Sequence, residues 1–160
     1  MKSKRKLKGV TLIETMLYIG LFSIILLMVL NFMMSTQEAT LKNNRRGAVY
    51  KTSEFLTQHL TNSFENAISI DNTNSVFGNN NGLLELNFSD GIKQYYLLNS
   101  TLFFDSVRIT PPDISVTQFF LEPIYNGDPN TPIAVKITID TVSNSDSTIT
   151  ETINLLSILR

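Results

Sequence analysis

The chain contains no cysteine, and His59 is its only histidine. The absence of cysteine excludes disulfide bonds, thiolate metal sites and a cysteine nucleophile. A lone histidine without a second histidine does not make a zinc site. No nucleophile motif, phosphate-binding glycine loop or paired-carboxylate pattern is present either. We therefore expect a protein that is not an enzyme and that holds no metal or other cofactor.

Charge is missing from one long stretch, residues 15–34, although 17% of the whole chain is charged. Before this stretch, residues 1–8 carry five Lys or Arg side chains and no acid. From Asp71 onward the chain is polar and rich in Asn, Ser and Thr. No broad basic face accompanies the formal net charge of −1, so nothing indicates a nucleic-acid partner.

The uncharged stretch is a candidate membrane span, because a helix needs about 20 apolar residues to cross a bilayer. A cleavable secretory signal has a shorter core of about 7–15 residues, followed by a small-residue cleavage site. Residues 34–39 offer no such site, so we expect an uncleaved anchor. The basic cluster before the span predicts a cytoplasmic N-terminus and an outward-facing C-terminus. Four basic residues on the other side weaken this signal: Lys42, Arg45, Arg46 and Lys51.

Glu14 is the one acid at the edge of this apolar segment. An acid at the centre of a spanning helix costs about 2.5–3.5 kcal/mol, and less near the interface. Glu14 can simply extend to the interface, or it can have a designated cationic partner. No Lys or Arg follows it within one helical turn, and the spacing from Lys8 is poor for a helical pair.

A cation would arise if the chain were cut after Gly9. The new α-ammonium on Val10, with a reference pKa of about 8, would lie four residues before Glu14. In a staggered array of parallel helices, each Glu14 could then reach the amine of a neighbour. Two charges that are costly singly become tolerable as a pair in a low dielectric. On this interpretation the acid sets the register between helices.

The six residues around this position form a short motif, Gly9-Val10-Thr11-Leu12-Ile13-Glu14. Together with the basic leader before it and the apolar run after it, the motif resembles the class III signal of type IV prepilins. The resemblance implies that a membrane prepilin peptidase cuts between Gly9 and Val10 and N-methylates Val10. It also implies that the following four residues serve peptidase recognition or assembly: Thr11, Leu12, Ile13 and Glu14. Of these, Glu14 would help to dock the subunit into the growing filament.

The chain departs from many major pilins in three respects. Val10 replaces the common Phe, no proline lies near the middle of the span, and a C-terminal cysteine pair is missing. The replacement at Val10 should be tolerated, whereas the missing proline, the missing cysteine pair and the large β-rich C-terminal segment favour a minor pilin or a type II secretion pseudopilin. The resemblance implies a structural subunit of a pilus, secretion or DNA-uptake filament, with roles such as protein secretion or cell adhesion.

The partners that the resemblance implies are other pilin subunits in a helix–helix filament core, the prepilin peptidase, the assembly platform and inner-membrane lipid. The subunit would first be a single-pass protein of the cytoplasmic membrane and then part of an extracytoplasmic filament (a fimbrium). The alternative function is an unprocessed, single-pass membrane-anchored binding domain that faces outward.

The sequence divides into four segments: a leader (1–9), a span or filament-core helix (10–34), an amphipathic helix (35–70) and an antiparallel β head (71–160). The amphipathic helix is predicted from a recurring apolar stripe, widened by Phe55 and Ile68. The stripe consists of Val49, Leu56, Leu60, Phe64 and Ala67. One helix over residues 10–70 would be about 90 Å long, and the alternative is two helices broken near 35–47.

The β head is predicted from alternating apolar residues and turn signals. The expected strands cover 83–88, 92–98, 101–104, 115–121, 133–140 and 148–156, with turns at 89–91 and 99–100. Residues 71–82 are expected to be a flexible loop. Asp128, beside Gly127 and Asn130, can be read as part of a calcium site, but solvated turns are the preferred interpretation. The predicted fold class is α+β: a long helix packed on an antiparallel sheet.

Overall fold

The computed structural model describes residues 11–127 and 131–159. In these residues one helix, α1 (Leu12–Asn66), precedes eight strands. The strands are β1 (Ser69–Val76), β2 (Leu83–Phe88), β3 (Gly91–Leu98), β4 (Thr101–Phe104), β5 (Val107–Arg108), β6 (Ile114–Tyr125), β7 (Pro132–Ser143) and β8 (Asp146–Ile158). Every pairing between these strands is antiparallel, which confirms the α+β prediction.

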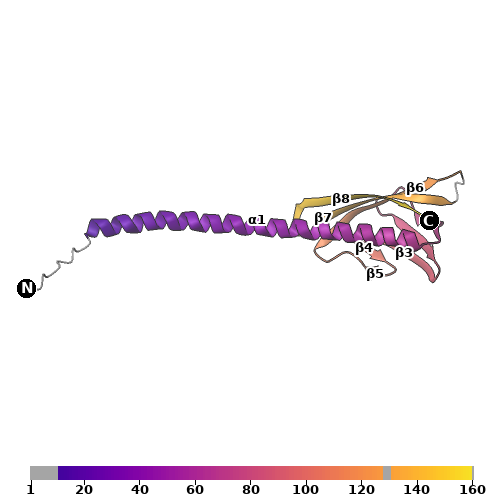
Figure 1. Cartoon of the computed structure of the whole chain (residues 1–160), viewed down its shortest axis with the longest axis horizontal. Coiled ribbons are helices and arrows are strands. Elements are labelled where there is room, and N and C mark those ends of the chain that lie inside the picture. The colour runs from indigo at the N-terminus through magenta and orange to yellow at the C-terminus, as the bar shows by residue number, and fades with distance from the viewer. Residues whose placement is uncertain (1–10, 128–130, 160) are drawn as a thin grey trace, which may run out of the picture. The chain divides into compact units, whose positions relative to one another are not determined.

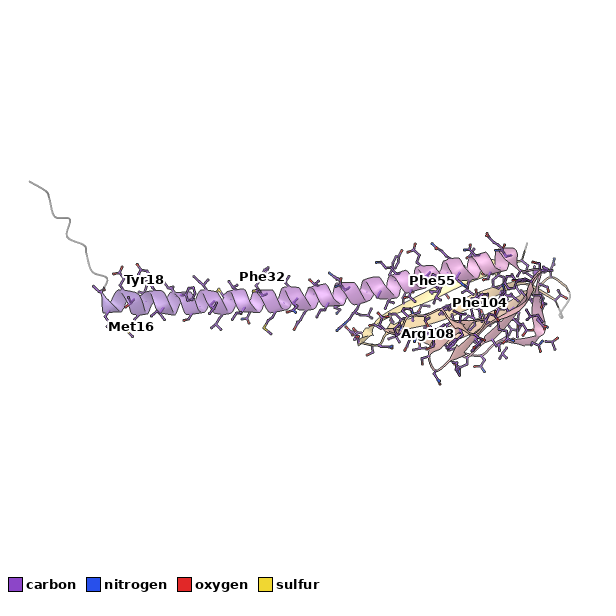
Figure 2. The ribbon with its side chains drawn as sticks, turned by 90° about the horizontal axis from the view of Figure 1, so that it is seen from below. Met16, Tyr18, Phe32, Phe55, Phe104 and Arg108 are labelled. Atoms are coloured by element: carbon purple, nitrogen blue, oxygen red, sulfur yellow. The ribbon has the colours of Figure 1, made fainter. Side chains whose placement is uncertain are left out.

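The chain forms two compact units, Met1–Lys42 and Asn43–Arg160, hereafter the N-terminal and C-terminal units. In the N-terminal unit, every described residue is exposed. A stretch of α1 near the N-terminus has a mean hydropathy of 2.3 and is long and apolar enough to cross a membrane. Its side chains project from all sides of the helix, as Met16, Tyr18 and Phe32 illustrate in Figure 2.

The hydroxyl groups in this apolar stretch are hydrogen-bonded within the helix. The Thr15 hydroxyl donates to the carbonyl of Leu12 at 2.7 Å, and the Ser23 hydroxyl donates to the carbonyl of Ile19 at 2.8 Å. Such bonds to the preceding turn remove a free donor from the helix surface. These two hydroxyl groups are therefore compatible with a lipid environment, where an unsatisfied polar group is costly.

In the C-terminal unit the strands form two sheets, with the orders β1-β2-β3-β4-β5 and β6-β7-β8. The later part of α1 lies against both sheets (Figure 1). One core cluster joins Leu56, Leu60 and Phe64 of the helix to Leu84 and Ile137, one residue from each sheet. Burial of this apolar helix stripe is the main force that holds the helix on the sheets.

The predicted helix stripe is confirmed, but the two residues expected to widen it are not buried. Val49 is 2% exposed and Phe64 is 1% exposed, whereas Phe55 is 47% exposed and Ile68 is 68% exposed. Phe55 is displaced by one residue, about 100° around the helix, from the buried Leu56. Ile68 lies beyond the last helical residue, so the helical period does not apply to it. Polar residues complete the buried face instead: Thr52, Ser53 and Ser63.

The prediction of a loop over 71–82 is wrong for its first half. The helix ends at Asn66, and β1 then pairs with β2, with Ser69 opposite Asn87 and Asp71 opposite Glu85. Asn, Asp and Ser disfavour strands locally, because their side chains bond nearby backbone groups. Here pairing with β2 outweighs that preference.

The tight turns of the first sheet lie where the sequence indicates. Ser89 and Asp90 connect β2 to β3, and Gly91 has a φ of 136°. Asn99 and Ser100 connect β3 to β4 with φ values of 49° and 58°. Positive φ at both central residues matches the twist of an antiparallel pair. β5 was not predicted, because two residues carry no periodic signal.

The second sheet has longer strands than predicted, and its β6 edge is closed by the segment 78–82. The Phe119 amide donates to the carbonyl of Asn80 at 2.8 Å, and the Gly82 amide donates to the carbonyl of Phe119 at 2.8 Å. A Cβ atom on Gly82 would lie 2.7 Å from the Phe119 oxygen. Glycine is therefore required where the two sheets are joined.

Candidate functional site

The motif recognised in the sequence lies at the start of α1. Gly9 and Val10, like the basic leader, lie outside the described residues. The four motif residues that follow are described and exposed: Thr11, Leu12, Ile13 and Glu14. Leu12 is 79% exposed and Ile13 is 76% exposed. Two large apolar side chains thus lie on the helix surface immediately before the acid.

Thr11 is the N-cap of α1. Its carbonyl accepts the amides of Glu14 and Thr15 at 3.1 and 3.2 Å, and its hydroxyl accepts the Glu14 amide at 3.4 Å. Thr followed three residues later by Glu is the capping-box pattern, which satisfies free amides at a helix start. The residues that resemble a processing signal thus also fit the pattern of a helix cap. Thr11 and Glu14 therefore also have a local structural role.

The Glu14 carboxylate is placed at the positive end of the helix dipole, where an acid is stabilised. It does not complete the capping box within the described residues. Its hydrogen-bond partner there is instead the Tyr18 hydroxyl, which donates to Oε1 at 3.1 Å. Tyr18 lies one turn further along the helix, a spacing at which side chains meet. Sequence reasoning missed Tyr18, although the four-residue spacing from Glu14 was visible.

Among the described residues, one hydroxyl donor leaves most of the hydrogen-bonding capacity of the Glu14 carboxylate unused. An ionised carboxylate has about four lone-pair positions, and Tyr18 takes one of them. The side chain is exposed in the N-terminal unit, so it is accessible to a cation from another molecule. The site can therefore accept an ammonium group while Tyr18 keeps the carboxylate oriented.

A second polar cluster joins α1 to β3 in the C-terminal unit. The hydroxyl of the fully buried Tyr95 lies 2.6 Å from His59 Nδ1 and 2.6 Å from Ser63 Oγ. The Phe104 ring packs against the rings of His59 and Tyr95, with distances between ring centroids of 4.9 Å and 4.5 Å. Figure 2 shows Phe55, on the helix, and Phe104, on the sheet, in this region.

Burial determines the protonation states in this cluster. Desolvation lowers the pKa of His59 and raises the pKa of Tyr95 well above its usual range. Tyr95 therefore remains a protonated donor, and His59 is neutral near pH 7. Ser63 is bonded to Tyr95 rather than to a base, so this geometry does not activate a nucleophile. The cluster is a hydrogen-bonded link between helix and sheet.

Glu85 of β2 is a buried acid, 4% exposed. Its carboxylate accepts hydrogen bonds from Asn74 Nδ2 at 3.1 Å and from Gln94 Nε2 at 2.9 Å. Backbone and side-chain donors, chiefly the Asn74 amide, lower the pKa of the nearby Asp71. Within the described ranges, no group of three His, Asp or Glu side chains is placed to hold a metal. Asp128 and Asn130 lie outside these ranges.

Comparisons with known proteins add no relative. No protein-family model matches this chain, and searches of curated proteins and of solved structures find no match. The interpretation of the site therefore rests on the residues and geometry of the chain itself.

Proposed function

We propose that this chain is a structural subunit, of the minor-pilin or pseudopilin kind, of a type IV pilus or a related secretion or DNA-uptake filament. It is made as a membrane-anchored precursor, cleaved after Gly9 and N-methylated at Val10. The observation that carries the proposal is the start of α1. There the Thr-Leu-Ile-Glu motif caps an apolar helix that is exposed over all its described residues in the N-terminal unit.

The exposed apolar surface supports assembly as well as anchoring. A contiguous apolar surface of this kind must be covered by lipid or by other apolar helices. In the precursor, lipid covers it; in a filament, the helices of neighbouring subunits replace the lipid. The basic leader keeps the N-terminus cytoplasmic until cleavage removes it.

Glu14 supplies the specificity that apolar packing lacks. Packing between apolar helices tolerates sliding, whereas an acid and an ammonium in a low dielectric must meet. The Val10 amine of a neighbouring subunit is the cation that cleavage provides. Tyr18 holds the Glu14 carboxylate at the helix surface, ready for that contact.

The decisive experiment is the intact mass of the chain extracted from membranes of a host that has prepilin peptidase. We expect a chain that lacks residues 1–9 and is heavier by one methyl group. The same chain in a peptidase-deficient host should retain its full length, which makes the comparison internally controlled. A full-length chain in the peptidase-positive host would overturn the proposal and favour an unprocessed, anchored binding protein.

A further inference from the structure

The second sheet of the C-terminal unit has an open edge at β8. In the order β6-β7-β8, β8 pairs with β7. The pairing runs from Ala134 opposite Ile158 to Ser143 opposite Asp146, and no described strand lies on the other side of β8. Every second residue of an edge strand directs its backbone N–H and C=O groups away from the neighbouring strand, toward the open side of the sheet. β8 has 13 residues, so about six residues present unpaired backbone groups.

The other edges of the two sheets are less available. The β6 edge is occupied by segment 78–82, through the backbone bonds of Asn80 and Gly82 to Phe119. β5 has two residues, and the register of β1 shifts between Asp71 and Val76. β8 is therefore the long, regular edge of the described structure.

From Thr150 to Ile158, β8 carries few of the features that usually protect an edge strand, Glu151 being its one charged residue there. Natural edges carry Lys, Pro or bulges that discourage pairing with another chain. β8 has no Lys and no Pro, and its register with β7 is regular from Thr150 to Ile158. The absence of such features indicates an edge that is covered when the protein functions.

A furrow runs between this edge and α1. Three hollows follow one another along it, with volumes of about 300, 370 and 320 Å³. The first two lie between Tyr50 of the helix and Glu151 of the strand, and the third lies between Thr61 and Ser157. We call this feature the α1–β8 furrow. A strand added to β8 would have one face against the flank of α1.

Ser157 marks the far end of the α1–β8 furrow. It is 5% exposed, and its hydroxyl has no hydrogen-bond partner among the described residues. Buried hydroxyl groups are normally paired, because leaving one unpaired costs free energy. The hydroxyl lines the third hollow, so a polypeptide there can supply the missing partner.

The side chains of the furrow define the chemistry of its occupant. Three carboxylates line the furrow, those of Glu54, Glu65 and Glu151. One guanidinium, that of Arg46, also lines it. Glu54 and Glu151 line the same hollow, so a cation there meets two acids. On the outer face of β8, Leu156 is 54% exposed and Ile158 is 55% exposed, which suits apolar neighbours.

We propose that β8 accepts an extended segment of another protein as a fourth strand, with a basic side chain of that segment between Glu54 and Glu151. Backbone pairing supplies the affinity, and the alternate side chains supply the specificity, as in other cases of strand addition. The partner is thus a polypeptide with a β-competent, basic segment. The proposal concerns the C-terminal unit and does not depend on cleavage after Gly9.

The test uses the full-length chain in detergent micelles and a fluorescent peptide of alternating Thr and Val with one central Lys. Binding is measured by fluorescence anisotropy. We expect saturable binding that weakens about tenfold when the central Lys is replaced by Glu. Two further peptides are N-methylated on alternate amides, one set for each edge of the peptide strand. N-methylation on one edge of the peptide should abolish binding, and N-methylation on the other edge should preserve it, because only one edge of the peptide strand pairs with β8.

Two variants of the chain provide a matched comparison. Glu151→Lys should weaken binding of the Lys peptide about tenfold, whereas Asp113→Lys, immediately before the opposite edge strand β6, should not change it. Hydrogen exchange should slow in β8, and not in β6, when the peptide is added. Absence of binding at millimolar peptide, or equal effects of the two N-methylated sets, would refute the proposal. Self-association of the free chain that protects β8 would identify a second copy as the occupant and also refute it.

Discussion

At the scale of single residues, the backbone amide and the side-chain carboxylate of Glu14 have separate roles. Its backbone amide is capped by Thr11, and its carboxylate is held by Tyr18. The cap requires only the amide, which any residue at this position provides. Substitutions of the side chain therefore separate the start of the helix from the contact with a neighbouring subunit.

Replacement of Glu14 should impair assembly and not processing. Glu14→Ala and Glu14→Gln should both be cleaved after Gly9 but incorporated poorly into filaments, because neither carries the charge that a neighbour's ammonium requires. The measurement is the ratio of filament-associated to membrane-associated subunit, with the intact mass confirming cleavage. Gly9→Leu is the converse control, which should remain uncleaved. Normal incorporation of Glu14→Gln would contradict the role in register.

Tyr18→Phe removes only the hydroxyl that orients the Glu14 carboxylate. We expect unchanged cleavage and a decrease in incorporation of about tenfold, smaller than for Glu14→Ala, since a hydrogen bond to a charged group contributes at least about 1.5 kcal/mol. The same incorporation assay measures the effect. A decrease as large as that of Glu14→Ala would mean that the Tyr18 hydroxyl does more than orient the carboxylate, and an unchanged incorporation would mean that this hydrogen bond is not needed.

His59 should make the stability of the C-terminal unit depend on pH. Burial lowers the pKa of His59 below its usual value of 6.5, so the folded state binds a proton less readily than the unfolded chain. The contribution of neutral His59 is complete above the unfolded pKa and is lost as the pH falls from 6.5 through the folded pKa. Urea unfolding in micelles between about pH 5 and 7.5 should show this decrease.

The matched control for that prediction is His59→Phe. Its stability should vary less over the same range, because the titrating group is gone. Asp71 and Asp90 have lowered pKa values through hydrogen bonds from Asn74 and Lys93, and both values lie below the range examined. An unchanged pH dependence in His59→Phe would show that another group is responsible.

At the scale of elements, α1 is one continuous helix with different surroundings along its length. Its described residues before Asn43 are all exposed and apolar in large part, whereas the later residues bury one face. Gly47 does not break it, and the alternative of two helices is not observed. Periodicity located the buried face, because the 3.6-residue repeat is a local property of the backbone.

Two phenylalanines on the same element provide a test of that face. Phe64→Ala should cost about 3–5 kcal/mol of the free energy of unfolding, because Phe64 is 1% exposed within the core. Phe55→Ala should cost less than about 1 kcal/mol, since Phe55 is 47% exposed and contacts chiefly the His59 ring. Urea denaturation of both variants in micelles measures the difference. Equal costs would contradict the assigned face.

At the scale of the whole molecule, the C-terminal unit is held together by contacts between segments far apart in the chain. Tyr95 links β3 to α1, Ser53 lies 3.4 Å from Thr141 of β7, and segment 78–82 ties the first sheet to β6. The last of these contacts depends on Gly82, because backbone approaches backbone there.

Gly82→Ala should therefore destabilise the fold. The new Cβ would lie 2.7 Å from the Phe119 oxygen, so the two segments must separate, at a cost of about 1–3 kcal/mol. Gly47→Ala is the matched control, because no atom lies within 4 Å of its Cβ position and alanine favours a helix by about 1 kcal/mol. The two substitutions should have opposite signs in urea unfolding, and a neutral Gly82→Ala would contradict the close approach.

The sequence by itself determined the apolar helix, its buried stripe, the six predicted strands and the tight turns. Each of these depends on the order of neighbouring residues, through side-chain periodicity or backbone preference. It also indicated the motif from Gly9 to Glu14, of which the structure describes the last four residues. The role of that motif in processing and assembly stays a prediction.

Only the tertiary structure decided the rest. β1 forms from a polar segment because β2 is available to pair with it, and Glu85 is buried because Asn74 and Gln94 supply its hydrogen bonds. The open edge of β8 likewise follows from the order of strands in space. These features depend on which distant segments meet, and a local pattern of residues carries no information on that.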